Sequence, residues 1–343
     1  MAPYSVLARV HIWPNCIGEP LFSLYIMHSA RQMFGSVQDL LKKHKLLFIN
    51  ILYKLIVMKI GIVGGSRGMG RWMLEFFKKR GYYTCFTSAD GESMFDSNVE
   101  MVGAVDTVLL CVPISAMQPV LEEIYPHLHG KMLVEVASVK KFVIEKFEAL
   151  QQQHPSVNCD FSSVHPMFAP TLVHLQGQVM LFTWQSGKGE TAAWLRQEFT
   201  RGRARLFDLD YLAHDRIMGV VQGLNHFNVF VSGRTLERLS GHTGSIKDFA
   251  SPSYRIFLIF YARYVLQDPQ LYAEIQMYNE FVPEVLEIFK QEVENLLSII
   301  KNKDRQAFVD YVKSARPYFE ENTEDLGISS HLIEQLGEYI SKQ

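Results

Sequence analysis

Polar side chains that could do chemistry directly follow two apolar segments of this sequence. Ser138 and Lys140 come after residues 132–136, and His165 comes after residues 161–164. A histidine can gain or lose a proton near neutral pH, and a serine at the end of a strand could touch a substrate. Each residue also has a plainer interpretation: Ser138 as a helix cap, Lys140 as a solvated helix residue and His165, before a proline, as a structural histidine.

A glycine-rich loop lies between the first predicted strand and the first predicted helix. The loop consists of Gly64, Gly65, Ser66, Arg67, Gly68, Met69 and Gly70. Glycines at such a turn let the backbone approach a pyrophosphate, which the N-terminus of the following helix attracts. Arg67 replaces the middle glycine of the GxGxxG pattern. The loop predicts a dinucleotide site, and a tight turn without a ligand is the alternative.

The residues after the second predicted strand bear on the choice of cofactor. An NAD site usually has an acidic residue about 20 positions beyond the loop. Ser88 stands there instead, and Asp90 follows two residues later. An arginine without that acid suits the 2′-phosphate of NADP, so Arg67 and Ser88 favour NADP while NAD stays open. Val112 and Pro113, after another apolar segment, are expected beside the nicotinamide ribose.

Short apolar segments alternate with amphipathic ones from residue 58 to residue 210. The predicted strands are residues 59–63, 82–87, 106–112, 132–136, 161–164, 179–183 and 204–208. The predicted helices are residues 71–80, 116–125, 140–153 and 191–200. This alternation indicates an α/β fold with a Rossmann-type, doubly wound and mostly parallel sheet. Because such sheets bind ligands beyond the carboxyl ends of their strands, the polar residues above should gather at one edge.

Strand signals stop after residue 210. Helices are predicted over residues 213–239, 253–266, 269–277, 283–301, 304–318 and 330–341. Residues 256–265 are apolar almost all round, which is typical of a helix buried in a core or against a partner chain. We therefore expect two domains, a nucleotide-binding domain over 58–210 and an all-α substrate and dimerisation domain over 211–343, in a homodimer.

The first 57 residues differ from the rest. Residues 46–57 are apolar but too short to span a membrane, and the lysines before them only mimic a signal peptide. Met58 opens a natural-looking start, MKIGIVGG. Residues 1–57 are therefore expected to be a dispensable extension.

Bulk composition excludes several classes of partner. The 343 residues carry a net charge of −2, so no global positive field exists to hold nucleic acid or an anionic membrane. The four cysteines are scattered, which argues against a disulfide framework or a metal site and fits the cytoplasm. A small-molecule substrate gripped by local groups is expected.

Several separated segments resemble one enzyme family in the same order along the chain. The segment from His165 to Pro170 (HPMFAP) resembles the HPMFGP signature of prephenate dehydrogenases, and Ser138-Val-Lys140 is similar to their SVK element. His214-Asp215 with Gln222 and His226 resembles their HD…Q…H helix. The run SPSYR, Arg263 and QDPQLY resembles the dehydrogenase part of the bacterial chorismate mutase–prephenate dehydrogenases. The resemblance covers residues 58–319.

The resemblance implies a role for each of these residues. His165 would take the proton of the substrate's ring hydroxyl as hydride leaves the same carbon, with help from Ser138. Arg263 would hold the ring carboxylate, a task that suits a bidentate guanidinium. His214 would lie against the cofactor. The residues expected to shape the substrate site are Lys140, His226 and Arg255, although Arg255 could equally form a structural ion pair.

The resemblance also has departures and rivals. Ala169 replaces the signature glycine, which would strain the loop if that position needs a positive φ. The N-terminal segment is too short for a mutase domain, so a monofunctional enzyme is expected. Prephenate and arogenate remain alternative substrates. The rival classes are another two-domain NAD(P) oxidoreductase, such as a β-hydroxyacid dehydrogenase or an imine reductase, and a cofactor-binding sensor without activity.

Overall fold

The computed structural model describes residues 58–320 and 324–342, and the predicted N-terminal extension lies outside them. Residues 58–343 group into one compact unit by their backbone contacts. Within the described part of the chain, no helix is long and apolar enough to cross a membrane.

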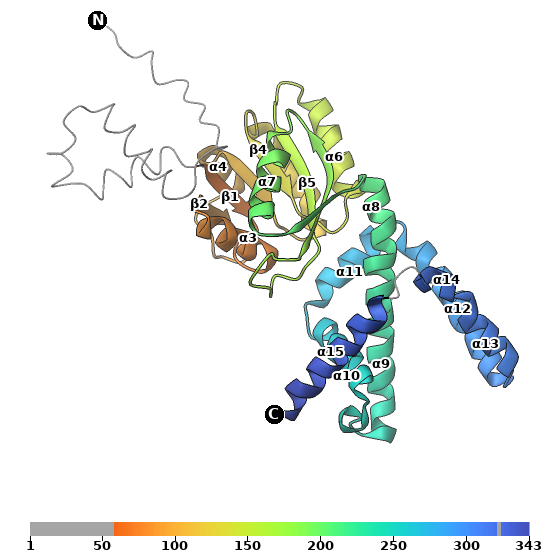
Figure 1. Ribbon diagram of the computed structural model, residues 1–343. Helices are drawn as coiled ribbons and strands as arrows, with labels where there is room; N and C mark the ends of the chain where they lie inside the picture. The colour runs from red at the N-terminus through yellow and green to blue at the C-terminus, as the bar shows by residue number, and fades with distance from the viewer. Residues whose placement is uncertain (1–57, 321–323, 343) are drawn as a thin grey trace, which may run out of the picture. The chain divides into compact units, whose positions relative to one another are not determined.

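A seven-stranded sheet forms the first half of this unit (Figure 1). The strands are β1 (Lys59–Val63), β2 (Tyr83–Thr87), β3 (Thr107–Leu110), β4 (Met132–Glu135), β5 (Asp160–Pro166), β6 (Val179–Ser186) and β7 (Arg205–Asp208). Their order across the sheet is β2-β1-β3-β4-β5-β6-β7, and every neighbouring pair is parallel except β5 and β6. The predicted α/β fold class is therefore confirmed.

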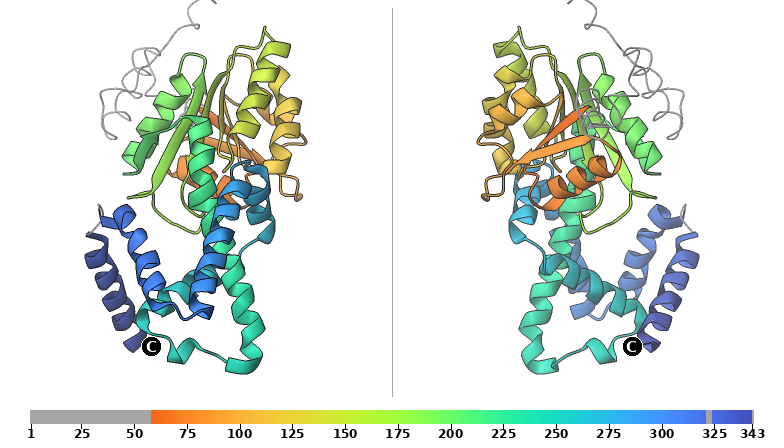
Figure 2. Two further views of the ribbon diagram at one scale, coloured as in Figure 1. Left: turned by 90° about the vertical axis from the view of Figure 1, so that its right-hand side faces the viewer. Right: turned by 90° about the vertical axis from the view of Figure 1, so that its left-hand side faces the viewer.

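Helices cover both faces of the sheet, as the views in Figure 2 show. The helices α3 (Gly68–Lys79) and α7 (Glu190–Arg201) enclose one hydrophobic core, and α4 (Asn98–Ala104), α5 (Ile114–Ile124) and α6 (Lys141–Gln153) enclose the other. β3 is buried at all four positions because both faces are covered. The sequence analysis missed α4, whose seven residues offer too little periodicity; Ser97 caps it by accepting from the Glu100 N–H.

One line of paired residues marks the carboxyl edge of the parallel strands. Val63 pairs with both Thr87 and Leu110, Leu110 pairs with Glu135, and Glu135 pairs with Ser163. The loops that follow these residues therefore emerge side by side along about 20 Å of sheet edge, at about 4.8 Å per strand.

The second half of the unit is helical. Its elements are α8 (Tyr211–Met218), the π-helical turn η2 (Gly219–Leu224), α9 (Asn225–Thr243), α10 (Pro252–Val265), α11 (Pro269–Tyr278), α12 (Val282–Lys301), α13 (Arg305–Ser314), α14 (Arg316–Phe319) and α15 (Glu324–Ser341). A short 3-10 turn lies at Lys247–Phe249, and another, Tyr125–His127, follows α5 in the sheet region. α8, η2 and α9 follow one another in a continuous rod, where a single helix over 213–239 was predicted (Figure 1).

The π-helical turn coincides with a close approach of two helices. A Cβ atom added at Gly223 would lie 2.7 Å from the Val282 side chain of α12. The close packing of the two helices therefore favours glycine at this position. π-helical turns within α-helices are frequent at functional sites.

A buried carboxylate joins the helical region to the sheet region. Glu274 of α11 accepts hydrogen bonds from the backbone N–H groups of Ile114 and Ser115, at 2.7 and 3.4 Å. These groups begin α5, whose N-cap residue Pro113 has no side chain able to accept them. The helical region thus caps a helix of the sheet region, which holds the two parts in register.

Candidate active site

The predicted site residues follow the paired line at the carboxyl edge of the sheet. The glycine loop begins one residue after Val63, Ser88 follows Thr87, and Val112 lies two residues beyond Leu110. Ser138 lies three residues beyond Glu135, and His165 two beyond Ser163. The structure thus brings residues from five strand ends to one edge, as the strand pattern predicted.

The glycine loop is shaped by tight packing against the strands beside it. Thr87 O accepts hydrogen bonds from the N–H groups of Gly64 and Gly65, at 2.8 and 3.2 Å. A Cβ atom at Gly65 would lie 2.3 Å from the Cβ of Phe86, and one at Gly70 would lie 2.0 Å from Gly64 O. Side chains at these positions would push the loop away from the sheet.

The start of α3 leaves room and backbone donors for an anion. Gly68 has φ +56°, and an added Cβ there would meet nothing within 4 Å. The side chain of Arg67, at the N-cap position, makes no capping hydrogen bond, and the first turn of the helix holds no acid. An open helix N-terminus with a glycine in the left-handed region fits the pyrophosphate of a dinucleotide.

A small polar cluster closes the other side of the loop. Ser66 Oγ lies 2.8 Å from Ser88 Oγ and donates to Asp90 Oδ2 at 2.6 Å. Hydrogen bonds from Ser66, and then Ser88, lower the pKa of the Asp90 carboxyl group. An anionic carboxylate therefore stands at the end of β2, two residues beyond the position where the sequence pattern placed it.

His165 is the first member of a buried hydrogen-bonded chain. The His165 side chain is 2% exposed, and its Nδ1 lies 2.9 Å from Nε2 of His214. Nδ1 of His214 lies 2.8 Å from Oδ1 of Asp215. β5 supplies the first histidine and α8 supplies the other two residues, so the chain crosses from the sheet region to the helical region.

Asp215 also caps the helix that follows Ser138. Its carboxylate accepts from Lys140 N at 2.9 and 3.1 Å and from Lys141 N at 2.9 Å. The N-cap residue of α6 is Lys140, and its own side chain makes no cap. The interpretation of Ser138 as the helix cap is therefore wrong: a carboxylate from α8 satisfies these donors, and the half-buried Ser138 stays in the loop before the helix.

Lys140 is buried under the site. Its Nζ lies 2.7 Å from Glu135 Oε1 and 2.7 Å from Val164 O, and its side chain is fully buried. Ser163 adds a further hydrogen bond to Glu135. The interpretation of Lys140 as a solvated helix residue is wrong, because these contacts hold the ammonium group behind the strand that carries His165.

Burial keeps both histidines of the chain neutral near pH 7. It lowers the pKa of His165 well below the ordinary value of 6.5, and the nearby His214 and Lys140 lower it further. Burial likewise lowers the pKa of His214, although the hydrogen bond to Asp215 opposes this effect. A neutral imidazole has one nitrogen free to accept a proton, which general base catalysis requires.

The loop after β5 connects His165 to α3 and to α10. The ring of Phe168 lies 4.9 Å from that of Trp72 on α3, and Trp72 Nε1 donates to Leu172 O at 2.7 Å. Nη2 of Arg263 on α10 lies 3.2 Å from Oγ1 of Thr171 in the same loop. Arg263 therefore contacts the loop that follows the strand of His165.

The signature position that departs from the family is not strained. Among the described non-glycine residues, only Arg203 and Lys303 have positive φ. Ala169 therefore adopts an ordinary backbone conformation, and the strain considered for this substitution does not arise.

His226 and Arg255 occupy different settings. His226 is buried among aromatic rings, with those of Tyr272 and Tyr264 at 4.8 and 5.2 Å, and burial lowers its pKa to about 4. Within the described residues its Nδ1 has no hydrogen-bond partner. Arg255 donates to Lys247 O at 2.9 Å and makes no ion pair with another described residue, so the structural ion pair considered for it is not found.

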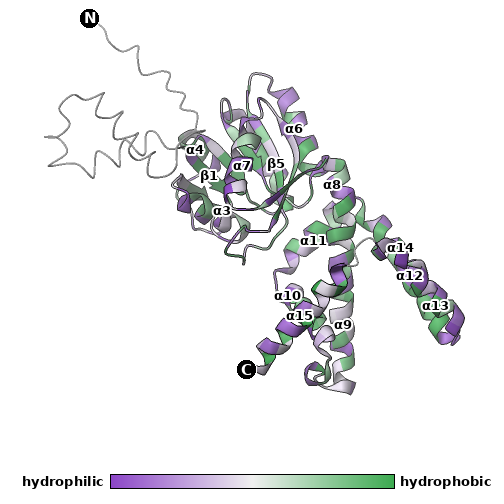
Figure 3. Cartoon of the chain, in the orientation of Figure 1, coloured by the Kyte–Doolittle hydropathy of each residue, from purple (hydrophilic) through white to green (hydrophobic). Residues whose placement is uncertain are grey.

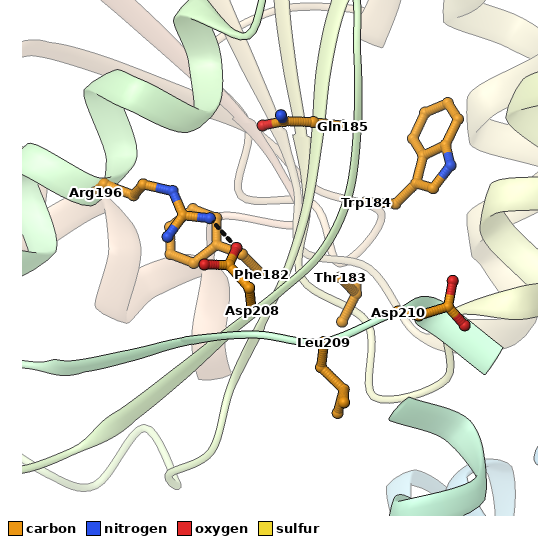
Figure 4. A pocket seen from close by; sticks show the side chains of 8 residues that line it. All are labelled: Phe182, Thr183, Trp184, Gln185, Arg196, Asp208, Leu209 and Asp210. Atoms are coloured by element: carbon orange, nitrogen blue, oxygen red, sulfur yellow. Dashed lines mark hydrogen bonds and ion pairs between the residues drawn. The ribbon is translucent and has the colours of Figure 1, made fainter. Parts of the chain in front are cut away.

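A separate hollow of 340 Å³ lies between β6, β7 and α7 (Figure 4). Phe182, Gln185, Arg196 and Asp208 are among its lining residues, and Arg196 is paired with Asp208 there. None of the predicted site residues lines this hollow. The glycine loop and the histidine chain, rather than this hollow, combine a possible cofactor cradle with a possible base.

Two residues of the site escaped the sequence analysis. Asp215 lies next to His214 in the resembling motif, but nothing in the sequence places its carboxylate at the start of α6. Glu135 ends a strand that reads as apolar, so only the pairing of β4 with β5 reveals that it holds Lys140. Among the described residues, no cluster of His, Cys, Asp and Glu is arranged to hold a metal ion.

Comparisons with known proteins show which family the chain belongs to. Residues 91–183 match the prephenate dehydrogenase nucleotide-binding domain, and residues 212–314 match the prephenate dehydrogenase dimerization domain. A probable arogenate/prephenate dehydrogenase of Methanocaldococcus jannaschii is 32% identical over 275 residues, which are 76% of this chain. The chain spans 60% of the length of that relative. A T-protein of Haemophilus influenzae is 27% identical over 81% of this chain and 71% of its own length.

Solved structures share the fold. A crystal structure of Synechocystis arogenate dehydrogenase covers 77% of this chain and 99% of its own, with a TM-score of 0.55 and 20% identity. Aquifex aeolicus prephenate dehydrogenase, in complex with hydroxyphenyl propionate and NAD+, covers 77% of this chain and 98% of its own, with a TM-score of 0.60 and 17% identity. With both domain models matched in order over more than half of its length, the chain belongs to the prephenate dehydrogenase family.

Proposed function

We propose that this chain oxidises and decarboxylates prephenate to 4-hydroxyphenylpyruvate with a nicotinamide cofactor, as a step towards tyrosine. The observation that carries the proposal is His165, neutral and held by His214, at the same sheet edge as the glycine loop. Arogenate is the second candidate substrate, because the relative that is 32% identical is named for both compounds. Neither the β-hydroxyacid dehydrogenase nor the sensor alternative accounts for the HPMF segment together with Arg263.

His165 acts as the base in this reaction. Its Nε2 accepts the proton of the ring hydroxyl while the carbinol carbon loses hydride, so that the hydroxyl becomes a ketone. A nicotinamide cofactor, held by the glycine loop, would supply the acceptor for that hydride. The bond to the ring carboxylate then breaks, its electron pair aromatises the ring, and the phenolic oxygen takes the proton back from His165. Atoms and charges balance with carbon dioxide as the leaving group.

The other residues orient the substrate. Arg263, beside the loop that follows His165, holds the ring carboxylate, and Ser138 hydrogen-bonds the ring hydroxyl. His226 and Arg255 shape the pocket from the helical region. Lys140 supports the floor of the site through Glu135 rather than touching substrate. Holding the hydroxyl and the carboxylate at fixed positions contributes to the rate by orientation.

Asp90 supports NAD as the preferred cofactor. A carboxylate at the end of β2 can accept a hydrogen bond from the 2′-hydroxyl of the adenosine ribose. The same negative charge would repel a 2′-phosphate. This position of Asp90 favours NAD over the NADP that Arg67 and Ser88 favoured in the sequence. Gly64, Gly65, Gly68, Met69 and Gly70 would cradle the pyrophosphate, with Val112 and Pro113 beside the nicotinamide ribose.

The helical region supports a homodimer. Large apolar side chains of α10 are half exposed, including Phe257, Ile259 and Phe260. Figure 3 shows hydrophobic residues along several helices of this region as well as in the sheet. A second copy of the chain is the occupant that the matched dimerization domain supports. An isologous interface would cover this surface on both copies at once.

A crossed assay tests the proposed function. The purified chain is given prephenate or arogenate with NAD+ or NADP+, and reduced cofactor is followed by absorbance while carbon dioxide is trapped. Turnover of prephenate with NAD+ is expected to exceed the other three combinations in kcat/KM. No reduction with either substrate would overturn the assignment.

Two variants assign the roles within the reaction. His165→Asn should lower kcat about a thousandfold with little change in KM, because the general base acts only in the transition state. Arg263→Ala should mainly raise KM, about tenfold or more, because it removes a carboxylate contact that is present before the reaction. Normal turnover by the His165 variant would contradict the proposal.

A further inference from the structure

We propose that Asp215 and His214 act as a positioning pair that locks His165 in the tautomer with its proton on Nδ1, which leaves Nε2 free as the base. The inference rests on the proposed function for its consequence in catalysis. Its physical content, the position of one proton, can be measured without substrate or cofactor.

The lock is the hydrogen-bonded chain from Asp215 through His214 to His165. It begins at a carboxylate, which can only accept hydrogen bonds. The Asp215 carboxylate receives N–H groups from Lys140, Lys141 and His214. Because its partner is an acceptor, Nδ1 of His214 must carry a hydrogen. Asp215 itself cannot turn away, because the two backbone donors that begin α6 hold it in place.

The lock then passes through His214 to His165. His214 is fully buried and neutral, and with its hydrogen on Nδ1 it can only accept at Nε2. Nε2 lies 2.9 Å from Nδ1 of His165, so Nδ1 of His165 must be the donor. A neutral His165 with its proton on Nδ1 has a bare Nε2, on the far side of the ring from His214.

The same chain eases the proton transfer itself. When Nε2 of His165 takes a proton, the ring becomes positive and its Nδ1–H bond to His214 becomes charge-assisted. The negative charge of Asp215 lies one imidazole away and favours that cation. Lys140 opposes it from behind the strand, but its charge is paired with Glu135.

Nothing else in the described surroundings competes for the proton on Nδ1. His214 is the hydrogen-bond partner that the structure gives to the His165 ring, which is 2% exposed. Without the lock, a neutral histidine in water divides its proton between both nitrogens. In the tautomer with the proton on Nε2, the ring could donate to the substrate hydroxyl but could not accept from it.

Asp215→Asn is the sharpest variant. The amide oxygen would accept from the backbone N–H groups of α6, and the amide N–H₂ would face His214. His214 would then accept at Nδ1 and donate from Nε2, so His165 would carry its proton on Nε2. By analogy with the orienting aspartate of serine proteases, kcat should fall about a thousandfold or more with KM nearly unchanged.

The experiment is a long-range ¹⁵N–¹H spectrum of the full chain labelled with ¹⁵N-histidine, recorded without ligands. Signals of His165 are assigned by their loss in His165→Gln. The wild-type chain should show a protonated Nδ1 and a bare Nε2, and Asp215→Asn should show the reverse. Asp215→Asn that keeps the wild-type tautomer would overturn the inference.

A second pair of variants guards against misfolding of the first. His214→Leu leaves Asp215 with its two backbone donors and should release the tautomer of His165. His214→Gln should preserve it, since an amide oxygen can accept from His165 while the amide N–H₂ donates to Asp215. A wild-type tautomer in His214→Leu would also overturn the lock.

Asp210→Asn is the matched control. Asp210 caps α8 through the N–H groups of Leu212 and Ala213 but makes no contact with the histidine chain, and asparagine is an equally good cap. It should keep the wild-type spectrum. If the tautomer inverts in Asp215→Asn while the wild-type chain turns over neither substrate, the lock stands and only the proposed function fails.

Discussion

The sheet region and the helical region of this chain hold their apolar residues differently. Around the sheet, rings such as Phe77, Phe147 and Phe161 are at most 1% exposed. On α10, Phe257 and Phe260 are 55% and 50% exposed, and no residue of that helix is buried. One region completes its core within a single chain, and the other presents apolar surface that a second chain can cover.

This difference bears on how the site is built. His165, His214 and Asp215 are placed by contacts buried within one chain, so the base is organised in each subunit. Arg263 and Arg255 lie on α10, the helix with the exposed apolar side chains. We therefore expect the chemistry of the base to depend on one chain and the grip on the substrate to depend on the assembly.

The largest expected effect contrasts two phenylalanines. Phe147 of α6 stacks on Phe161 of β5 in the core between the helix and the sheet, with 4.2 Å between the ring centres. Phe147→Ala should lower the free energy of unfolding by about 3–5 kcal/mol through the cavity it leaves. Phe257→Ala should cost the dissociated chain only about 0.5 kcal/mol. Denaturant unfolding at low protein concentration measures both, and equal losses would remove the contrast.

A charge on α10 should break the dimer. Phe260→Glu places a carboxylate where two copies of the chain would meet, twice in a symmetric interface. Phe260 is 50% exposed in the single chain, so the interface can bury only about half of each ring. The two copies together then lose about 1.5–3 kcal/mol, and the dissociation constant should rise roughly 10- to 100-fold. Sedimentation velocity across protein concentrations measures this change. Gln152→Glu, at the exposed end of α6, is the control, and an unchanged dimer in Phe260→Glu would place the interface elsewhere.

The smallest expected effect concerns the acid stability of the helical region. The folded chain keeps His226 neutral with a pKa of about 4, against an ordinary value of 6.5. The unfolded chain therefore binds the proton first as the pH falls, so this contribution is full above about pH 6.5 and is lost between there and about pH 4. The loss from His226 between pH 7.5 and 5 should be about 2 kcal/mol.

His226→Phe tests this effect, because phenylalanine suits a pocket formed by Tyr264, Tyr272 and Phe230. The variant should show a flatter fall of unfolding free energy between pH 7.5 and 5. His165 and His214, also buried and neutral, should still give the folded chain a loss of stability in acid of the same sign. An unchanged slope in the variant would mean that His226 is protonated in the folded chain.

Most elements around the sheet were predictable because their patterns are local. The β-branched segment at residues 59–63 and the glycine loop after it appear where expected, and the later strands agree within a few residues. α4 was missed because it is short. The single helix predicted over 213–239 is divided by η2, since an apolar period does not reveal that Gly223 must admit Val282.

The sequence by itself determined the alternating α/β order, the candidate base at the end of a strand, and the set of motifs that marks the family. These depend on residue types and on spacings along the chain. Only the tertiary structure decided that Asp215 caps α6, that Lys140 is buried against Glu135, and that His214 stands behind His165. Those contacts join strands and helices that are distant in sequence, and a hydrogen bond across such a distance depends on packing that no local pattern encodes.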